Sequence, residues 1–249
     1  MRLLSLTLAT LLFPTATPPV LVENMQLSYK VDRGEAQLAR AQFVLDDKTW
    51  DFTNARFDVS ATEGGLLIER PEDGFSYPLK MNALADVTAA DARGVWVDFA
   101  PGRVIGSVQS ARLEKGGDTT TLGRASINCR ASARSVHPID SCLNSGRVQV
   151  SSVGGSADAR AVDISELDLN IARGKTNFSV RVGGIGRITG SGTTTHEAQV
   201  STVKIKIDKV RLGILDITGQ FFSQIKDLES ESLRVQRPFI WVIYEKGSK

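Results

Sequence analysis

The sequence predicts an all-β protein, a mainly antiparallel meander whose curved sheet forms a groove or a sandwich, with one short helix near the C-terminus. Apolar residues recur at every second position in most segments, which is the period of a strand with one buried face. Gly, Asp and Asn cluster between these segments, as turn residues do. The connections are also short, whereas parallel strands need crossovers of about a dozen residues, so we expect antiparallel pairing.

Residues 1–19 are expected to precede this fold as a secretory signal peptide. Arg2 is followed by an apolar run over residues 3–13 and by a proline-containing segment that ends at Pro19, which is the order of features in such signals. The run is shorter than the roughly 20 residues of a membrane-spanning helix, so no transmembrane span is expected. The alternative is an N-terminal strand of a cytosolic protein. Residues 20–249 are then interpreted as a single β-rich domain.

Strands and turns alternate through the middle of the chain. Turn residues occur at 32–34, 64–65, 73–74, 91–94, 116–117 and 173–175. Period-two patterns predict strands over residues 27–31, 39–45, 50–61, 66–68, 79–87, 95–99, 102–113, 120–131, 147–153, 161–171 and 178–182. The alanines of residues 79–87 would also permit a helix.

Residues 199–244 carry the clearest pattern. Val203, Ile205 and Ile207 alternate with charged residues, which predicts a half-buried strand that turns at residues 208–209. Residues 210–217 carry apolar residues on both sides of the segment, as in a strand covered on both faces. A last strand is expected over residues 233–244, where Pro238 marks an edge or a bend.

The one expected helix follows Thr218, a residue that can cap a helix N-terminus. Phe221, Phe222, Ile225 and Leu228 then form a single helical stripe. The stripe is interpreted first as core that fixes the helix on the sheet. The alternatives are a plug at the end of an apolar trough or a contact with a membrane surface.

Cys129 and Cys142 are the only cysteines. In an exported protein such a pair is most simply a disulfide, and closing a loop of about 14 residues stabilises the fold by on the order of 3 kcal/mol. In the cytosol they would be two unrelated buried thiols. The polar loop between them, residues 129–142, is also the only candidate seam between domains.

Composition and motifs argue against several classes of function. The formal charge is +2 and like charges are dispersed, so no nucleic-acid partner is expected. The glycines of residues 184–190 are spaced GxGxxxG and precede no apolar helix, so they are interpreted as turn and twist positions rather than a phosphate loop. His137 and His196 do not have the spacing of a zinc site with the cysteines, and no nucleophile elbow surrounds any serine. We therefore expect no metal, no cofactor and no enzymatic activity.

An exported chain of meandering strands with small aliphatic inward residues and no reactive cluster resembles the periplasmic β-groove lipid carriers, the AsmA-like and lipopolysaccharide-bridge proteins. The resemblance is one of overall texture across residues 25–244, and no functional residue is carried over from it. It implies a long curved sheet whose concave apolar face holds acyl chains. The expected location is the periplasm, the cell envelope or the outside of the cell.

The expected function is therefore that of an exported, non-enzymatic carrier of lipid or another apolar ligand. Candidate groove residues are Phe57, Val59, Val180, Val182, Ile205 and Ile207, with Phe221 and Phe222 at one end. The alternative is a structural or protein-interaction β-sandwich or barrel of the periplasm or cell envelope, with a possible envelope protein as its partner. The two differ in whether the inward apolar residues pack on one another or line an open surface.

Overall fold

The computed structural model describes residues 20–45, 48–62, 65–80, 87–100, 102–130, 138–156, 164–227, 229 and 233–243. The expected signal peptide lies outside the described residues, and so do residues 81–86 of the strand expected over residues 79–87. Within the described ranges the chain forms one large antiparallel sheet with two short α-helices. The predicted fold class is confirmed, including the short helix near the C-terminus.

The elements follow one another in a simple succession of strands. The N-terminal half contains β1 (Val20–Lys30), β2 (Arg33–Leu45), β3 (Lys48–Thr62), β4 (Gly65–Arg70), η1 (Pro71–Asp73), β5 (Phe75–Lys80), β6 (Val87–Ala100), β7 (Arg103–Val108), β8 (Ser110–Lys115), β9 (Asp118–Leu122) and β10 (Ala125–Arg130). The C-terminal half contains α2 (Pro138–Asn144), β11 (Ser145–Ser156), β12 (Ile164–Ala172), β13 (Lys175–Val182), β14 (Gly186–Glu197), η3 (Ala198–Val200), β15 (Thr202–Leu212), β16 (Leu215–Asp216), α3 (Thr218–Lys226), β17 (Leu233–Gln236) and β18 (Phe239–Ile243).

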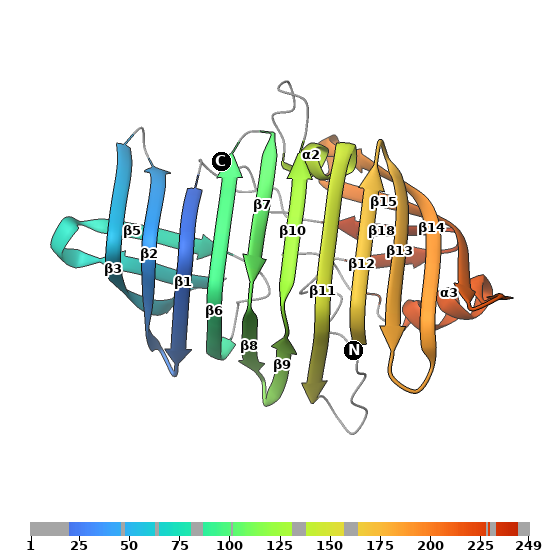
Figure 1. The fold of residues 1–249 in the computed structure, drawn as a ribbon, viewed down its shortest axis with the longest axis horizontal. Helices are drawn as coiled ribbons and strands as arrows, with labels where there is room; N and C mark the ends of the chain where they lie inside the picture. Colours follow the sequence, from blue (N-terminus) through green and yellow to red (C-terminus); the bar gives the residue numbers. More distant parts are fainter. Residues whose placement is uncertain are drawn as a thin grey trace.

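Hydrogen bonding sets the order of the strands across the sheet (Figure 1). From one edge to the other it runs β5, β4, β3, β2, β1, β6, β7 with β8, β10 with β9, β11, β12, β13, β14, β15, β18 and β17. The order departs from a plain meander at β1, which pairs with both β2 and β6, and at β15, which pairs with β18 as well as with β14. The hairpins β2 to β5 therefore extend the sheet on one side of β1, and the rest of the chain extends it on the other.

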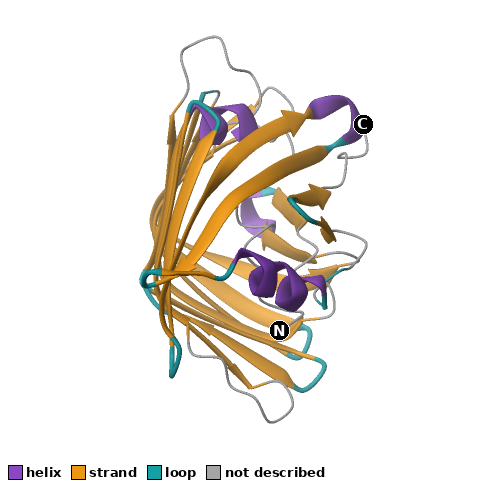
Figure 2. Cartoon of the chain, turned by 90° about the vertical axis from the view of Figure 1, so that its right-hand side faces the viewer, coloured by secondary structure: helices purple, strands orange, loops and turns teal. Residues whose placement is uncertain are grey.

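The sheet forms a curved wall, and α3 lies on its inner side (Figure 2). At the N-terminal end, β5 crosses behind β1, β2 and β3 in the view of Figure 1. Aromatic rings fill the space between these layers: the Phe75 ring lies 4.9 Å from Phe52 and 5.0 Å from Phe43, centroid to centroid. Phe57 and Val59, each 2% exposed, belong to the same buried cluster. This end of the inner face is therefore closed by the chain itself.

A second core closes the C-terminal end. Phe222 of α3 packs with Ile207 and Val210 of β15 and with Val235 of β17. The stripe predicted for this helix thus serves as core, as far as it is described; Leu228 lies outside the described residues. Pro238 lies in the turn between β17 and β18, in agreement with the bend predicted there.

The turn expected at residues 208–209 is wrong, because β15 continues through it. A bulge is formed here instead: Ser191 pairs with Lys209, but the next residue, Gly192, pairs with Ile207. The extra residue in β15 shifts its alternation by one position. Ile207 and Val210 consequently face the same side of the sheet, three residues apart.

The strand predicted over residues 210–217 with both faces covered is also wrong. β15 ends at Leu212, and a tight turn leads into the two residues of β16. Ile214 and Leu215 are 97% and 62% exposed. Apolar residues on both sides of this segment predicted burial on both faces, but Ile214 lies in the turn and Leu215 follows it directly.

Candidate functional site

Cross-strand pairing aligns apolar residues into continuous rows on the inner face. Directly paired residues point to the same side of a sheet, so a row can be followed from strand to strand. The central row is Phe52, Ala41, Val22, Val97, Gly106, Ile127, Val148, Leu169, Phe178, Gly190 and Val210. It contains no polar side chain from β3 to β15.

Two further rows flank the central row. The upper row is Trp50, Phe43, Val20, Phe99, Val104, Cys129, Gly146, Ile171, Thr176, Gly192 and Ile207. The lower row is Phe57, Ala36, Leu27, Ala92, Ala111, Leu122, Val153, Ile164, Val182 and Gly186. Thr176 is the one polar member, and its hydroxyl is hydrogen-bonded to that of Thr194. The inner face is therefore apolar over almost its whole width.

The opposite face has the reverse character. One row between those above, on the outer side, is Asn128, Arg147, Asn170, Asn177, Ser191 and Lys209. Arg147 forms a two-pronged ion pair with Asp168 there, with N···O distances of 3.1 and 2.7 Å. Hydrogen bonding by Arg147 lowers the pKa of the Asp168 carboxyl. This face is suited to water, whereas the apolar side chains of the sheet lie on the inner side.

Burial along the rows is uneven, and this marks the candidate site. At the two ends, side chains such as Phe52 and Val210 are buried by β4, β5, α3 and β17. Between them lies a set that we call the middle patch, on β11, β12 and β13. Its members are Val148, Leu167, Leu169, Ile171, Val180 and Val182. All six are only half-buried, and none belongs to a core cluster formed by the described part of the chain. Val150 and Val153, on the same face of β11, are buried beside them.

The predicted groove residues fall into two groups. Val180 and Val182 lie in the middle patch. Phe57 and Val59 are buried in the N-terminal core, so their surface is already occupied by their own neighbours.

The remaining four groove candidates belong to the C-terminal end. Ile207 and Phe222 are buried there, and Ile205 and Phe221 are packed against them. Phe221 does touch the central row, with its ring centroid 6.1 Å from that of Phe178. These four residues therefore form the end wall of the middle patch.

Four members of the middle patch were not among the predicted site residues. Val148, Leu167, Leu169 and Ile171 lie in segments predicted as strands, so the alternating pattern was visible. The alternation does not show which strands pair with one another. It therefore does not show which apolar rows are left uncovered by other parts of the chain. The useful signal would have been the large aliphatic residues of β12, which recur on one side of that strand opposite Asp168 and Asn170.

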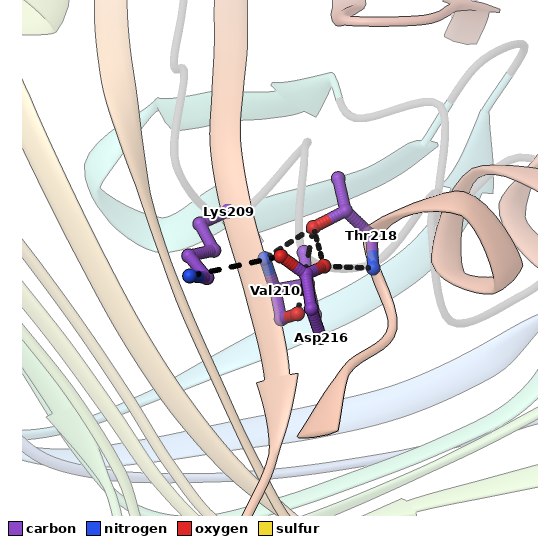
Figure 3. Close-up of polar contacts among 4 residues, drawn as sticks. All are labelled: Lys209, Val210, Asp216 and Thr218. Atoms are coloured by element: carbon purple, nitrogen blue, oxygen red, sulfur yellow. Dashed lines mark hydrogen bonds and ion pairs between the residues drawn. The ribbon is translucent and has the colours of Figure 1, made fainter. Parts of the chain in front are cut away.

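A small polar contact fixes the end wall (Figure 3). The Asp216 carboxylate accepts hydrogen bonds from the backbone N–H of Thr218 at 3.0 Å and from its hydroxyl at 2.7 Å. The Thr218 hydroxyl oxygen accepts a bond from the N–H of Val210 at 2.9 Å. Thr218 was predicted to cap α3, but it is the first helical residue, and Asp216 supplies the acceptor. These bonds tie the start of α3 to β15.

Acid should weaken this anchor. The hydrogen bonds from Thr218 lower the pKa of the Asp216 carboxyl below its ordinary 3.8, so the folded state binds this proton less readily than the unfolded chain does. The stabilisation is present at pH values above 3.8 and is lost as the pH falls through the lowered pKa. We expect Asp216→Asn to reduce the acid dependence of the free energy of unfolding, measured by urea denaturation at a series of pH values. Asp227→Asn removes the same charge at the other end of α3, and an equal effect of both variants would contradict the assignment.

The disulfide lies beside the upper row. Cys129 and Cys142 are bonded, with their Cα atoms 4.4 Å apart, so the predicted pairing is confirmed. Cys142 belongs to α2, a helix within the loop that was expected to be irregular. Leu143 of α2 packs against Val203 and Val242, and α2 stands at the upper edge of the wall in Figure 1. The bond therefore holds α2 against the sheet at this edge.

Other kinds of site find no support in the described part of the chain. No three residues among its His, Cys, Asp and Glu side chains are grouped to hold a metal ion. No helix within the described ranges combines the length and the apolarity needed to cross a bilayer. His196 lies on β14, whereas His137 lies outside the described residues, so their suggested roles stay predictions. The glycines of the 184–190 segment are in a turn and in β14, where a Cβ on Gly190 would lie 2.2 Å from the Phe178 ring.

Comparison with known proteins adds no relative: no family model, no curated protein and no solved structure matches the chain.

Proposed function

We propose that this protein is an exported, non-catalytic carrier that binds the acyl chains of a lipid on the middle patch. The observation that carries the proposal is the uneven burial of the apolar rows. They are closed by the chain at both ends, whereas most of their aliphatic side chains on β11, β12 and β13 are only half-buried; the exceptions are Val150 and Val153 of β11, each 5% exposed. An apolar surface of this kind gains about 0.8 kcal/mol for each methylene of a ligand that it removes from water. A flexible hydrocarbon chain fits a surface that offers apolarity and few hydrogen bonds.

The dimensions of the patch suit an acyl chain. Neighbouring strands lie about 4.8 Å apart, so β11 to β13 span roughly 10 Å across the sheet. Leu167 to Ile171 extend along β12 for roughly 13 Å at about 3.3 Å per residue. A segment of several methylenes can lie along this surface, with Phe178 and Phe221 at its C-terminal end. The polar part of the lipid would stay in water.

Export is supported by the disulfide. Disulfides persist in oxidising compartments and are rare in the cytosol, and Cys129 and Cys142 form one. The reactive chemistry of an enzyme is not needed for carriage, because binding and release by an apolar surface require no covalent step. We therefore propose that the protein works in the periplasm, in the cell envelope or outside the cell.

The proposal predicts that purified protein carries lipid. Mass spectrometry of an organic extract should show acyl lipid in an amount comparable with the protein, because the half-exposed patch gains free energy only when it is covered. A mock purification from cells without the protein gives the background. An extract at background level, together with no binding of a fluorescent fatty acid in solution, would contradict the carrier function. That result would favour the alternative of a structural module whose patch is covered by another protein.

A further inference from the structure

Two neighbouring turns at one end of the sheet carry exposed aliphatic side chains. Ile185 lies between β13 and β14 and is 57% exposed, and Ile214 and Leu215, at 97% and 62%, lie at the turn from β15 to β16. The pairing of Val182 with Gly186 and of Ile188 with Leu212 brings both turns to the same end of adjoining strands. We call Ile185, Ile214 and Leu215 the apolar tip. It lies at the end of the wall opposite α2, where the β13–β14 turn is seen in Figure 1.

The apolar tip is not explained by folding. Single exposed aliphatic residues are normal on protein surfaces. Here three of them share adjoining turns, and an isoleucine that is 97% exposed contributes no apolar burial to the fold. Turn positions of this kind are more often polar. The side chains are therefore free to enter another apolar phase.

Arginines lie on the strands that lead to the tip. Arg181 and Arg187 face each other across β13 and β14 on the outer face, and Arg211 lies diagonally beside them on β15. Glu166 forms ion pairs with Arg181, at 3.4 Å, and with Arg187. Within the described ranges no ion pair involves Arg211. Asp216 pairs with Arg211 across β15 and β16, and Lys209 forms an ion pair with Asp216 at 3.7 Å. Three guanidinium groups and one ammonium group thus face two carboxylates, and the surroundings of the tip keep a net positive charge.

The tip is continuous with the candidate lipid site. Val182 belongs to the middle patch, and Ile188 and Leu212 continue the apolar inner face across β14 and β15. A Cβ placed on Gly186 would lie 3.6 Å from a Leu212 methyl group, so the two strands are in close contact beside the turns. An unbroken apolar path therefore leads from Val182 to the tip.

We propose that the apolar tip docks on a membrane surface that carries anionic headgroups. Ile185, Ile214 and Leu215 enter the boundary between headgroups and acyl chains, as the apolar side of an interfacial segment does. Arg187 and Arg211 contact the phosphates of the lipid headgroups, because guanidinium groups form bidentate hydrogen bonds with phosphate. Docking itself needs only the tip. The further step, in which a lipid moves between the membrane and the middle patch, rests on the proposed function.

Flotation with lipid vesicles tests the docking. Purified protein should bind vesicles of phosphatidylcholine mixed with phosphatidylglycerol, and more weakly those of phosphatidylcholine alone, because the second kind lacks net negative charge. Ile214→Ser with Leu215→Ser should lower binding to the mixed vesicles about tenfold or more, since two aliphatic side chains no longer enter the membrane. Arg211→Gln should lower it about fivefold and make the remainder less sensitive to added salt.

Val200→Ser is the matched control. Val200 is 61% exposed in η3, at the other end of β14 and β15, so its loss should leave vesicle binding unchanged. Equal losses in Val200→Ser and in the tip variant, or no binding to either vesicle, would overturn the docking proposal. Binding of a fluorescent fatty acid in solution separates the two proposals. The tip variant should retain it; if the unaltered protein lacks it while vesicle binding depends on the tip, docking stands and carriage fails.

Discussion

Replacing Phe75 by alanine is expected to lower the free energy of unfolding by about 3–5 kcal/mol. Phe75 is 2% exposed and is the residue through which β5 covers the N-terminal end of the inner face. Its ring contacts those of Phe43, Trp50, Phe52 and Phe57, with centroid distances between 4.9 and 5.6 Å. Alanine would leave a cavity between two layers of strands, in addition to losing the apolar transfer energy of the ring.

Phe239→Ala makes the same chemical change on the outer face. Phe239 is only half-buried and touches Trp241 and the ammonium of Lys204, so we expect a loss of about 1 kcal/mol. Urea denaturation followed by tryptophan fluorescence measures both variants. Equal losses would show that the aromatic cluster around Phe75 is not a core. Because this cluster is distant from β12, folded Phe75→Ala protein should still bind a fatty acid in solution.

Alternation within the sequence was enough to predict most of the strands and the charged outer side of β15, and the short connections predicted antiparallel pairing. These features depend on neighbouring residues, which the sequence displays directly. The disulfide could also be predicted from the sequence. A chain with two cysteines allows only one intramolecular pairing. The α2 helix was missed because most of its contacts, such as Leu143 with Val203 and Val242, are tertiary and its few residues show no period.

The candidate site was harder to predict than the strands. Phe57 and Val180 look alike in the sequence, since each alternates with polar neighbours on a strand. Their burial differs because β4 and β5 fold back over Phe57, whereas Val180 belongs to no core cluster of the described residues. The bulge at residue 208 is a second feature that the sequence alone does not reveal. The extra residue in β15 moves each later side chain of that strand to the opposite face of the sheet. Its position is evident only from the pairing of β15 with β14.

Polar replacements within the middle patch should abolish most lipid binding at little cost in stability. Val148→Thr and Leu169→Gln nearly conserve volume and place a hydroxyl and an amide where a bound acyl chain would lie. Burying each group without a hydrogen-bond partner costs about 1–3 kcal/mol, so the double variant should bind a fluorescent fatty acid at least about thirtyfold more weakly. The free protein should hardly be destabilised, because both side chains are half-buried outside the core clusters of the described residues.

Val31→Thr provides the control for this change. Val31 is 69% exposed in the turn between β1 and β2, so the same valine-to-threonine replacement there adds a hydroxyl far from the patch and should leave fatty-acid binding unaltered. Titration of both variants, with thermal unfolding as a check on folding, distinguishes two causes of lost binding. If the patch variant binds as well as Val31→Thr, the acyl chain does not lie on β11 and β12. If it binds weakly but also unfolds far more readily, the patch is part of a closed core, and the half-exposed rows do not hold a ligand.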